Sequence, residues 1–173
     1  MQKISENSLG RFATNAGGAL GGTALGIFDD NDWVNQLKVY SNLTITHEVK
    51  FVLLLVTLSL YLDLLAERTG DLLSEEQLHF LRKEMQKGFV FLLNTVWATD
   101  KSNYDNLPGL LDDFSNMMKD KKSKSKMTTP QAYTWLLIEK CVKGVPEEML
   151  IWYINFAIKL FEEKNLRNQL REI

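Results

Sequence analysis

The chain has 173 residues, of which 45% are hydrophobic, so it is long enough for one domain with its own core and too short for two independent ones. Its formal net charge of -2 leaves no overall positive field to attract phosphates, which argues against nucleic acid as a partner. The single cysteine, Cys141, excludes an intramolecular disulfide, and the chain begins with no long apolar stretch, so we expect a cytoplasmic protein.

Residues 1–30 are rich in glycine and lack a sustained apolar face. This composition predicts a poorly ordered arm, followed by a single helical domain over residues 31–173. Each glycine within a helix costs about 0.5 to 1 kcal/mol relative to alanine, which disfavours an isolated helix here. We therefore expect that a chain starting near Asp29 still folds.

Within this arm, Gly18, Gly22 and Gly26 recur every four residues. Small residues at this spacing are typical of closely packed helix pairs in membranes. The alternative to a free arm is therefore that these three glycines contact a membrane or a helical partner. A phosphate-binding loop is disfavoured, because Gly22 is followed by Thr23 rather than by lysine.

The next two segments predict helices. A short helix is expected over residues 33–40, after the capping residues at 29–32. A longer one is expected from His47 to about Glu67. It contains the charge-free run from Phe51 to Leu62, which is shorter than the roughly 20 apolar residues that a membrane span needs. The run therefore favours a buried helix over a span.

Ser74 and Gln77 form a capping-box pattern, and apolar residues then recur at three- and four-residue steps from Leu78 to Val96. This segment is the clearest amphipathic helix in the chain. Pro108 predicts the first turn of the next helix.

The lysine-rich stretch at about 119–128 carries no arginine and no interleaved aromatic residue. We interpret it as a solvated linker rather than as a site for an anionic partner. Thr129 and Pro130 follow it and predict the start of another helix.

Pro146 predicts the start of the last long helix, which is apolar almost all the way round from Met149 to Phe161. A helix of this kind cannot expose both of its faces on a monomer. We expect Trp152 and Phe156 to lie in the core and the other side to contact a ligand or a partner. The residues predicted for that contact are Ile151, Ile154, Ile158 and Phe161.

Glu76 and His79 have the spacing with which carboxylate-bridged di-iron bundles aim two ligands at one metal. That chemistry needs the pair twice, and the other histidine, His47, has Thr44 three residues before it. We therefore expect no metal and no other cofactor. Cys141 is expected on the inward side of its helix, as a small hydrophobe rather than a nucleophile.

Together these segments predict an all-α fold, a compact bundle of five or six helices. The helices around residues 51–65 and 149–161 are expected at its centre, with the helix at 78–96 packed over them. Because no catalytic motif is present, the leading hypothesis is a non-enzymatic binding or regulatory protein that contacts a protein partner or a second copy of itself. The first alternative is a carrier or sensor of an apolar, fatty-acid-like molecule held between the two most apolar helices. The second is peripheral membrane association through the glycine-rich arm.

Overall fold

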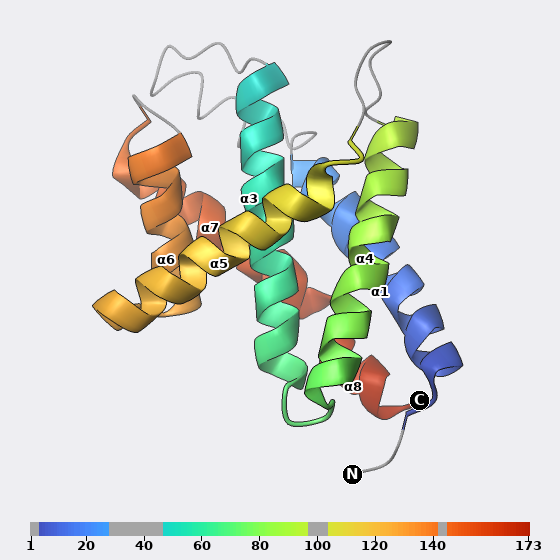
Figure 1. Ribbon diagram of the computed structural model, residues 1–173. Coiled ribbons are helices and arrows are strands. Elements are labelled where there is room, and N and C mark those ends of the chain that lie inside the picture. The colour runs from blue at the N-terminus through green and yellow to red at the C-terminus, as the bar shows by residue number, and fades with distance from the viewer. Residues whose placement is uncertain (1–3, 28–46, 97–103, 142–144) are drawn as a thin grey trace.

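The computed structural model describes residues 4–27, 47–96, 104–141 and 145–173, and all regular structure in these ranges is helical (Figure 1). The elements are α1 (Glu6–Gly26), α3 (His47–Thr69), α4 (Glu75–Val96), α5 (Leu107–Ser125), α6 (Thr129–Leu136), its π-helical continuation η2 (Leu137–Cys141), α7 (Glu147–Glu163) and α8 (Leu166–Arg171). They confirm the predicted all-α fold. The helix expected over residues 33–40 lies outside the described residues.

Helix α3 lies at the centre of the bundle, and every residue from Leu53 to Leu65 is buried. The helices α1, α5, α6, α7 and α8 all pack against it (Figure 1). Polar groups in this run are paired inside the core, since an unpaired one would cost about 1 to 3 kcal/mol. The Thr57 hydroxyl donates to the Leu53 carbonyl at 2.8 Å, and the Tyr61 hydroxyl donates to the Ala157 carbonyl at 2.9 Å.

Over Val49–Thr69, α3 is long and apolar enough to cross a membrane, judged by length and composition alone. A core helix has the same properties. Here most of the stretch is buried by the other helices, as the sequence prediction of a buried helix requires.

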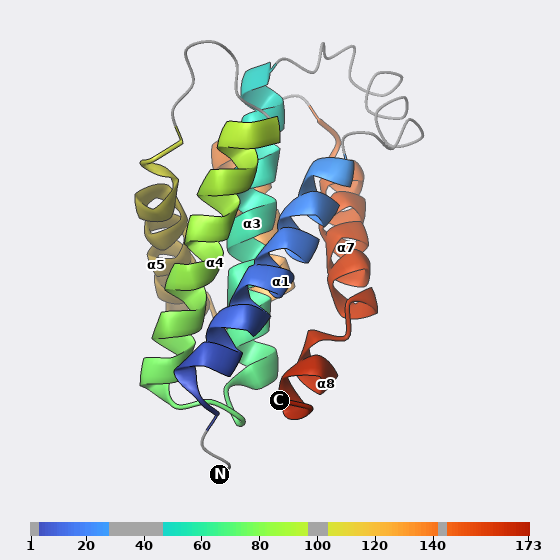
Figure 2. The ribbon, with the colours of Figure 1, turned by 90° about the vertical axis from the view of Figure 1, so that its right-hand side faces the viewer.

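The glycine-rich segment forms helix α1, so the prediction of a poorly ordered arm is wrong for its described part. Ser5 caps the helix, because its side-chain oxygen accepts a hydrogen bond from the Ser8 N–H at 3.2 Å. Small and apolar residues then line one buried face: Leu9, Phe12, Ala13, Ala16, Gly17, Leu20, Gly21 and Ala24. The glycines lower the stability of the helix, but the apolar area that this face buries against α4 offsets the loss (Figure 2).

Two glycines allow α1 and α4 to approach closely. A Cβ added to Gly17 would lie 3.6 Å from the backbone of Met85. One added to Gly21 would lie 2.6 Å from Cδ2 of Leu92, closer than real Cβ contacts. Gly17 therefore brings α1 against the backbone of α4, and Gly21 makes room for the side chains of Leu92 and Phe89.

Gly18, Gly22 and Gly26, the glycines that the sequence pattern singled out, do not take part in this contact. No atom of the described chain lies within 4 Å of a Cβ added at any of the three. They face outward on α1, and their contact with a membrane or a partner stays a prediction.

Two further helix starts follow the sequence pattern. The Gln77 N–H donates to Ser74 Oγ at 3.2 Å and the Ser74 N–H donates to Gln77 Oε1 at 3.0 Å, which confirms the capping box at α4. Helix α6 begins where it was predicted, but Thr128 rather than Thr129 caps it, through a second capping box with Gln131.

Helix α5 has Pro108 in its first turn, as predicted, but it continues through most of the expected linker at 119–128, which is therefore helical and not a connecting loop. The exposed charges of this stretch are compatible with a helix because they pair along it. Lys124 Nζ lies 3.0 Å from the carboxylate of Asp120, four residues earlier. The helix ends at Lys126, whose φ of 52° is left-handed.

Helix α7 begins directly after Pro146, as predicted. Its buried residues are Leu150, Tyr153, Ile154, Ala157 and Phe161. It packs directly on α3: the hydroxyls of Tyr153 and Thr57 share a hydrogen bond of 2.5 Å, and the rings of Tyr61 and Phe161 lie 5.6 Å apart. Binding of an apolar ligand between these two helices stays a prediction.

Apolar residues of this helix form two stripes in the sequence, and the structure divides both. The stripes are Trp152, Tyr153, Phe156 and Leu160 on one side and Ile151, Ile154, Ile158 and Phe161 on the other. Trp152 is 39% exposed and Phe156 is partly buried, so the prediction that these two form the core is wrong. The real buried face recurs at three- and four-residue steps and takes members from each stripe. The residues predicted for ligand or partner contact separate into Ile154 and Phe161, which are in the core, and Ile151 and Ile158, which remain partly exposed.

Candidate functional site

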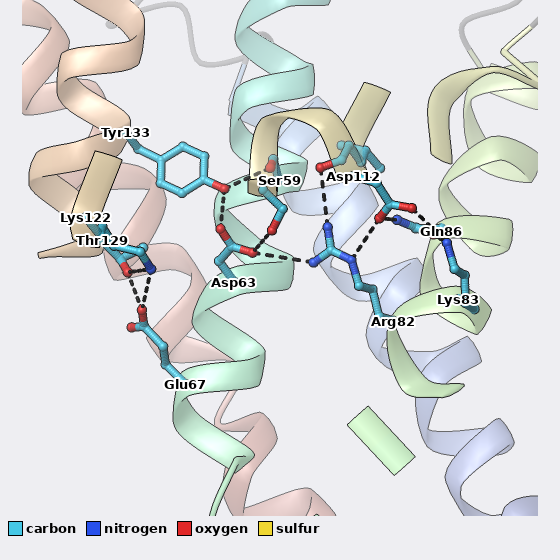
Figure 3. Close-up of polar contacts among 12 residues, drawn as sticks. Ser59, Asp63, Glu67, Arg82, Lys83, Gln86, Asp112, Lys122, Thr129 and Tyr133 are labelled. Atoms are coloured by element: carbon cyan, nitrogen blue, oxygen red, sulfur yellow. Dashed lines mark hydrogen bonds and ion pairs between the residues drawn. The ribbon is translucent and has the colours of Figure 1, made fainter. Parts of the chain in front are cut away.

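The most polar part of the interior is built around Asp63, a buried carboxylate on the central helix (Figure 3). It accepts a hydrogen bond from Ser115 Oγ at 2.5 Å and another from the Tyr133 hydroxyl at 2.6 Å. Ser115 lies on α5 and Tyr133 on α6, so one side chain of α3 joins three helices. A buried carboxylate needs such partners, because an unpaired charge in the interior is very costly.

Arg82 brings α4 into the same network. Its guanidinium donates from Nη1 to Asp63 at 3.4 Å, from Nε to Asp112 at 3.1 Å and from Nη2 to the Leu111 carbonyl at 3.3 Å. Figure 3 shows the guanidinium lying between the two carboxylates. Because a guanidinium has five N–H groups, one donor remains uncommitted on each terminal nitrogen.

Asp112 is the outer carboxylate of the network. Lys83 Nζ and Gln86 Nε2 each donate to it at 2.8 Å, in addition to Arg82. Partial burial raises the pKa of Asp112, but the hydrogen bonds from Lys83, Gln86 and Arg82 outweigh this and lower it to about 2. The carboxylate is therefore ionised at neutral pH.

Tyr133 is the neutral donor of the network. Burial, followed by the negative charge of Asp63, raises the pKa of Tyr133 well above its usual value. Its oxygen also lies 2.8 Å from Ser59 Oγ on α3. The phenol therefore keeps its proton and holds Asp63 by donating to it.

A second polar cluster lies one turn further along α3. Glu67 forms an ion pair with Lys122 Nζ at 3.3 Å and accepts a hydrogen bond from the Thr129 hydroxyl. Lys122 also donates to Thr129 at 2.9 Å. This cluster ties α5 and α6 to α3 at the surface, below the Asp63 network in Figure 3.

A pocket adjoins the Asp63 network, between α3, α4 and α5. We call it the α3–α4–α5 pocket. Its volume is about 280 Å³, just below the roughly 300 to 1,000 Å³ of sites for drug-sized ligands. It is lined by Leu62, Asp63, Leu65, Ala66, Glu75, Leu78, His79, Leu81, Arg82, Met85, Ser115 and Lys119. Its walls are thus mostly apolar, with charged groups at the floor and at the mouth.

The chemistry of the site is that of holding charges rather than of moving protons. A general acid or base works best with a pKa near the operating pH. The lowered pKa of Asp112 and the raised pKa of Tyr133 both move away from neutrality. The arrangement is suited to recognising a polar group next to an apolar one.

The residues that the sequence singled out for metal binding are not brought together. His79 lies at the mouth of the pocket, and Glu76 is exposed. Within the described ranges, no three histidine, cysteine, aspartate or glutamate side chains are grouped as metal ligands. The side chains of His47 and Cys141 lie outside the described part of the chain.

Sequence reasoning missed the Asp63 network, although one signal was present. Asp63 ends the charge-free run of the predicted buried helix, and Leu64 and Leu65 continue that run beyond it. A carboxylate in such a place requires a buried partner. The partner itself was not predictable, because Arg82 and Tyr133 lie 19 and 70 residues away along the chain.

Comparison with known proteins returned no match to a protein-family model, to a curated protein or to a solved structure.

Proposed function

We propose that this chain is a non-enzymatic binding protein whose α3–α4–α5 pocket takes a small, mostly apolar molecule. The observation that carries the proposal is the pocket itself, whose apolar walls stand beside a few convergent polar groups. Pockets of this composition between the helices of a bundle are common ligand sites. The site differs from the one expected from the sequence, which lay between α3 and α7 rather than between α3, α4 and α5.

The wide spacing of α3 and α4 supports a pocket that persists in the folded protein. The backbones of these two helices approach each other far less closely than those of α1 and α4. Arg82 spans the gap and is fixed at three acceptors. A well-anchored side chain thus bridges the two helices, and the pocket lies beside it.

The experiment is a titration of the full chain with 1-octanol and with octanoate, followed by two-dimensional amide NMR. We expect shifts concentrated at the lining residues of α3, α4 and α5 for at least one probe. Ala66→Phe should abolish them, because Ala66 lines the pocket and is exposed, so a larger side chain fills the space without removing core packing.

The matched control is Ala19→Phe, at an exposed alanine on α1 that does not line the pocket. It should bind both probes as the unmodified chain does. Absence of localised shifts with both probes, or equal binding by the Ala66→Phe chain, would overturn the proposed function.

A second candidate is a protein partner or a second copy bound to the outer side of α7. One observation favours it: Ile151 and Trp152 are 40% and 39% exposed, and the Trp152 ring stacks on Phe156 at 5.2 Å. Exposed aromatic side chains of this kind are frequent anchors of interfaces. Sedimentation equilibrium of the chain and of Trp152→Ala tests self-association. A monomer at all concentrations in both would remove the second-copy form of this candidate.

A further inference from the structure

The polar groups at the floor of the α3–α4–α5 pocket differ in how many of their hydrogen-bonding positions are already used. The Asp63 carboxylate already accepts from Ser115, Tyr133 and Arg82. Arg82 uses three of its five N–H groups and lines the pocket. Spare hydrogen-bonding capacity at the floor therefore belongs mainly to a cationic donor.

The mouth of the pocket also offers a cationic donor with spare hydrogen-bonding capacity. Lys119 lines it, and its ammonium forms no ion pair with any residue in the described ranges. His79 adds a further nitrogen. The opposing group is the exposed carboxylate of Glu75, in the first turn of α4. A cation entering the pocket would find Glu75 at the mouth, but at the floor it would meet a carboxylate that already accepts three hydrogen bonds.

The walls of the pocket determine which hydrocarbon part the ligand can have. Leu62, Leu65, Leu78, Leu81 and Met85 surround the space with aliphatic groups, and none of the lining residues is aromatic except His79. The volume of about 280 Å³ suits a molecule smaller than a drug-sized ligand. A short, flexible hydrocarbon fits these walls better than a large planar ring system.

We propose that the ligand of the α3–α4–α5 pocket is a small aliphatic carboxylate, bound by Arg82 and Lys119 through its carboxylate and by the leucine walls through its hydrocarbon part. This inference rests on the proposed function and specifies its ligand class. Arginine is suited to the task because its planar N–H groups match the geometry of a carboxylate. An aliphatic chain of medium length buries its apolar surface in the space left between α3 and α4.

The test compares three probes of equal chain length, octanoate, 1-octanol and octylamine, by calorimetric titration of the full chain. We expect octanoate to bind about tenfold more tightly than octanol, because hydrogen bonds to charged groups are the stronger kind. Octylamine should bind most weakly. Lys119→Gln should weaken octanoate about threefold to tenfold and leave octanol unchanged. Glu75→Gln should strengthen octanoate, because it removes a like charge from the mouth.

Lys159→Gln is the matched control, since Lys159 is an exposed lysine on α7 that does not line the pocket. It should not change the affinity for any probe. Both Lys119 and Glu75 are exposed, so these variants should fold normally. Equal binding of octanoate and octanol, or preference for octylamine, would overturn the carboxylate inference and leave the proposed function standing. No binding of any probe would overturn both.

Discussion

Helix α4 packs against its neighbours in two different ways. On one side it lies along α1 (Figure 2), where Gly17 faces the Met85 backbone and Gly21 faces apolar side chains of α4. On the other side Arg82 reaches across to Asp63 on α3 and Asp112 on α5. The first contact is close and apolar, whereas the second is directional and polar and leaves a pocket beside it.

The difference shows how side-chain size decides where a helical bundle can hold a ligand. Small residues let two helices approach until dispersion contacts fill the interface. A partly buried arginine needs acceptors within hydrogen-bond distance, and Arg82 finds them on α3 and α5. Both sides of α4 therefore contribute to stability, and the arginine side is the one that adjoins the pocket.

The largest loss of stability should come from removing helix α1, which forms the glycine side of the contact. A chain that begins at residue 29 lacks α1 and uncovers the part of α4 around Met85 and Phe89, which lie against Gly17 and Gly21. We expect it to lose its cooperative thermal transition, measured by circular dichroism, because the α1–α4 contact is the most extensive between any two helices of the described structure. This reverses the expectation drawn from composition alone.

The control for the truncation is a chain that begins at Ile4. It keeps the Ser5 cap and the whole of α1. Its melting temperature should match that of the full chain. If the chain starting at residue 29 melted cooperatively at the same temperature, the α1–α4 contact would not be needed for folding.

The arginine side should be the next most sensitive. Asp63→Ala removes the acceptor shared by Ser115, Tyr133 and Arg82 and leaves all three in a mostly buried site. We expect the free energy of unfolding in urea to fall by about 3 kcal/mol. Asp113→Ala is the control: Asp113 is exposed, and its loss should change stability by less than about 0.5 kcal/mol. Equal effects of the two changes would contradict the network.

A matched pair of glycine changes sharpens the role of close approach. Gly17→Leu forces side-chain atoms toward the Met85 backbone, and we expect it to lower the free energy of unfolding by about 2 kcal/mol. Gly18→Leu meets open space and replaces a poor helix former, so it should raise stability by about 0.5 to 1 kcal/mol. Urea unfolding at one pH measures both. Opposite signs are the diagnostic result, and equal losses would mean that α1 packs on another face.

The smallest effect should depend on pH. The pKa of Asp112 is lowered to about 2 in the folded chain from 3.8, so its ion pairs stabilise the fold above pH 4 and are lost as the pH falls from about 4 to 2. Asp112 is 35% exposed, and solvent screening reduces the contribution to about 1 kcal/mol.

Asp112→Asn should therefore unfold more easily than the unmodified chain at pH 6 and about equally near pH 2, as measured by urea unfolding at each pH. A difference that stayed constant over this range would show that Asp112 acts through packing rather than through its charge.

Several elements were determined by the sequence alone, because their causes lie within one or two turns of the chain. The capping box of Ser74 and Gln77 forms between residues three apart, and Pro108 marks the first turn of α5. The apolar run that became the buried part of α3 needs no neighbour to be recognised as a core helix. The all-α fold follows from such local signals.

Other features were decided by the tertiary structure, because they depend on which residue lies opposite. The glycines of α1 disfavour an isolated helix, and packing against α4 stabilises the helix in the folded chain. The apolar helix α7 offers several stripes of similar character, and only its neighbours select the buried one. The pocket is lined by Asp63 and Arg82, which are 19 residues apart in the chain and meet across two helices. Periodicity and capping are properties of a segment, whereas burial and charge pairing are properties of a contact between segments distant in sequence.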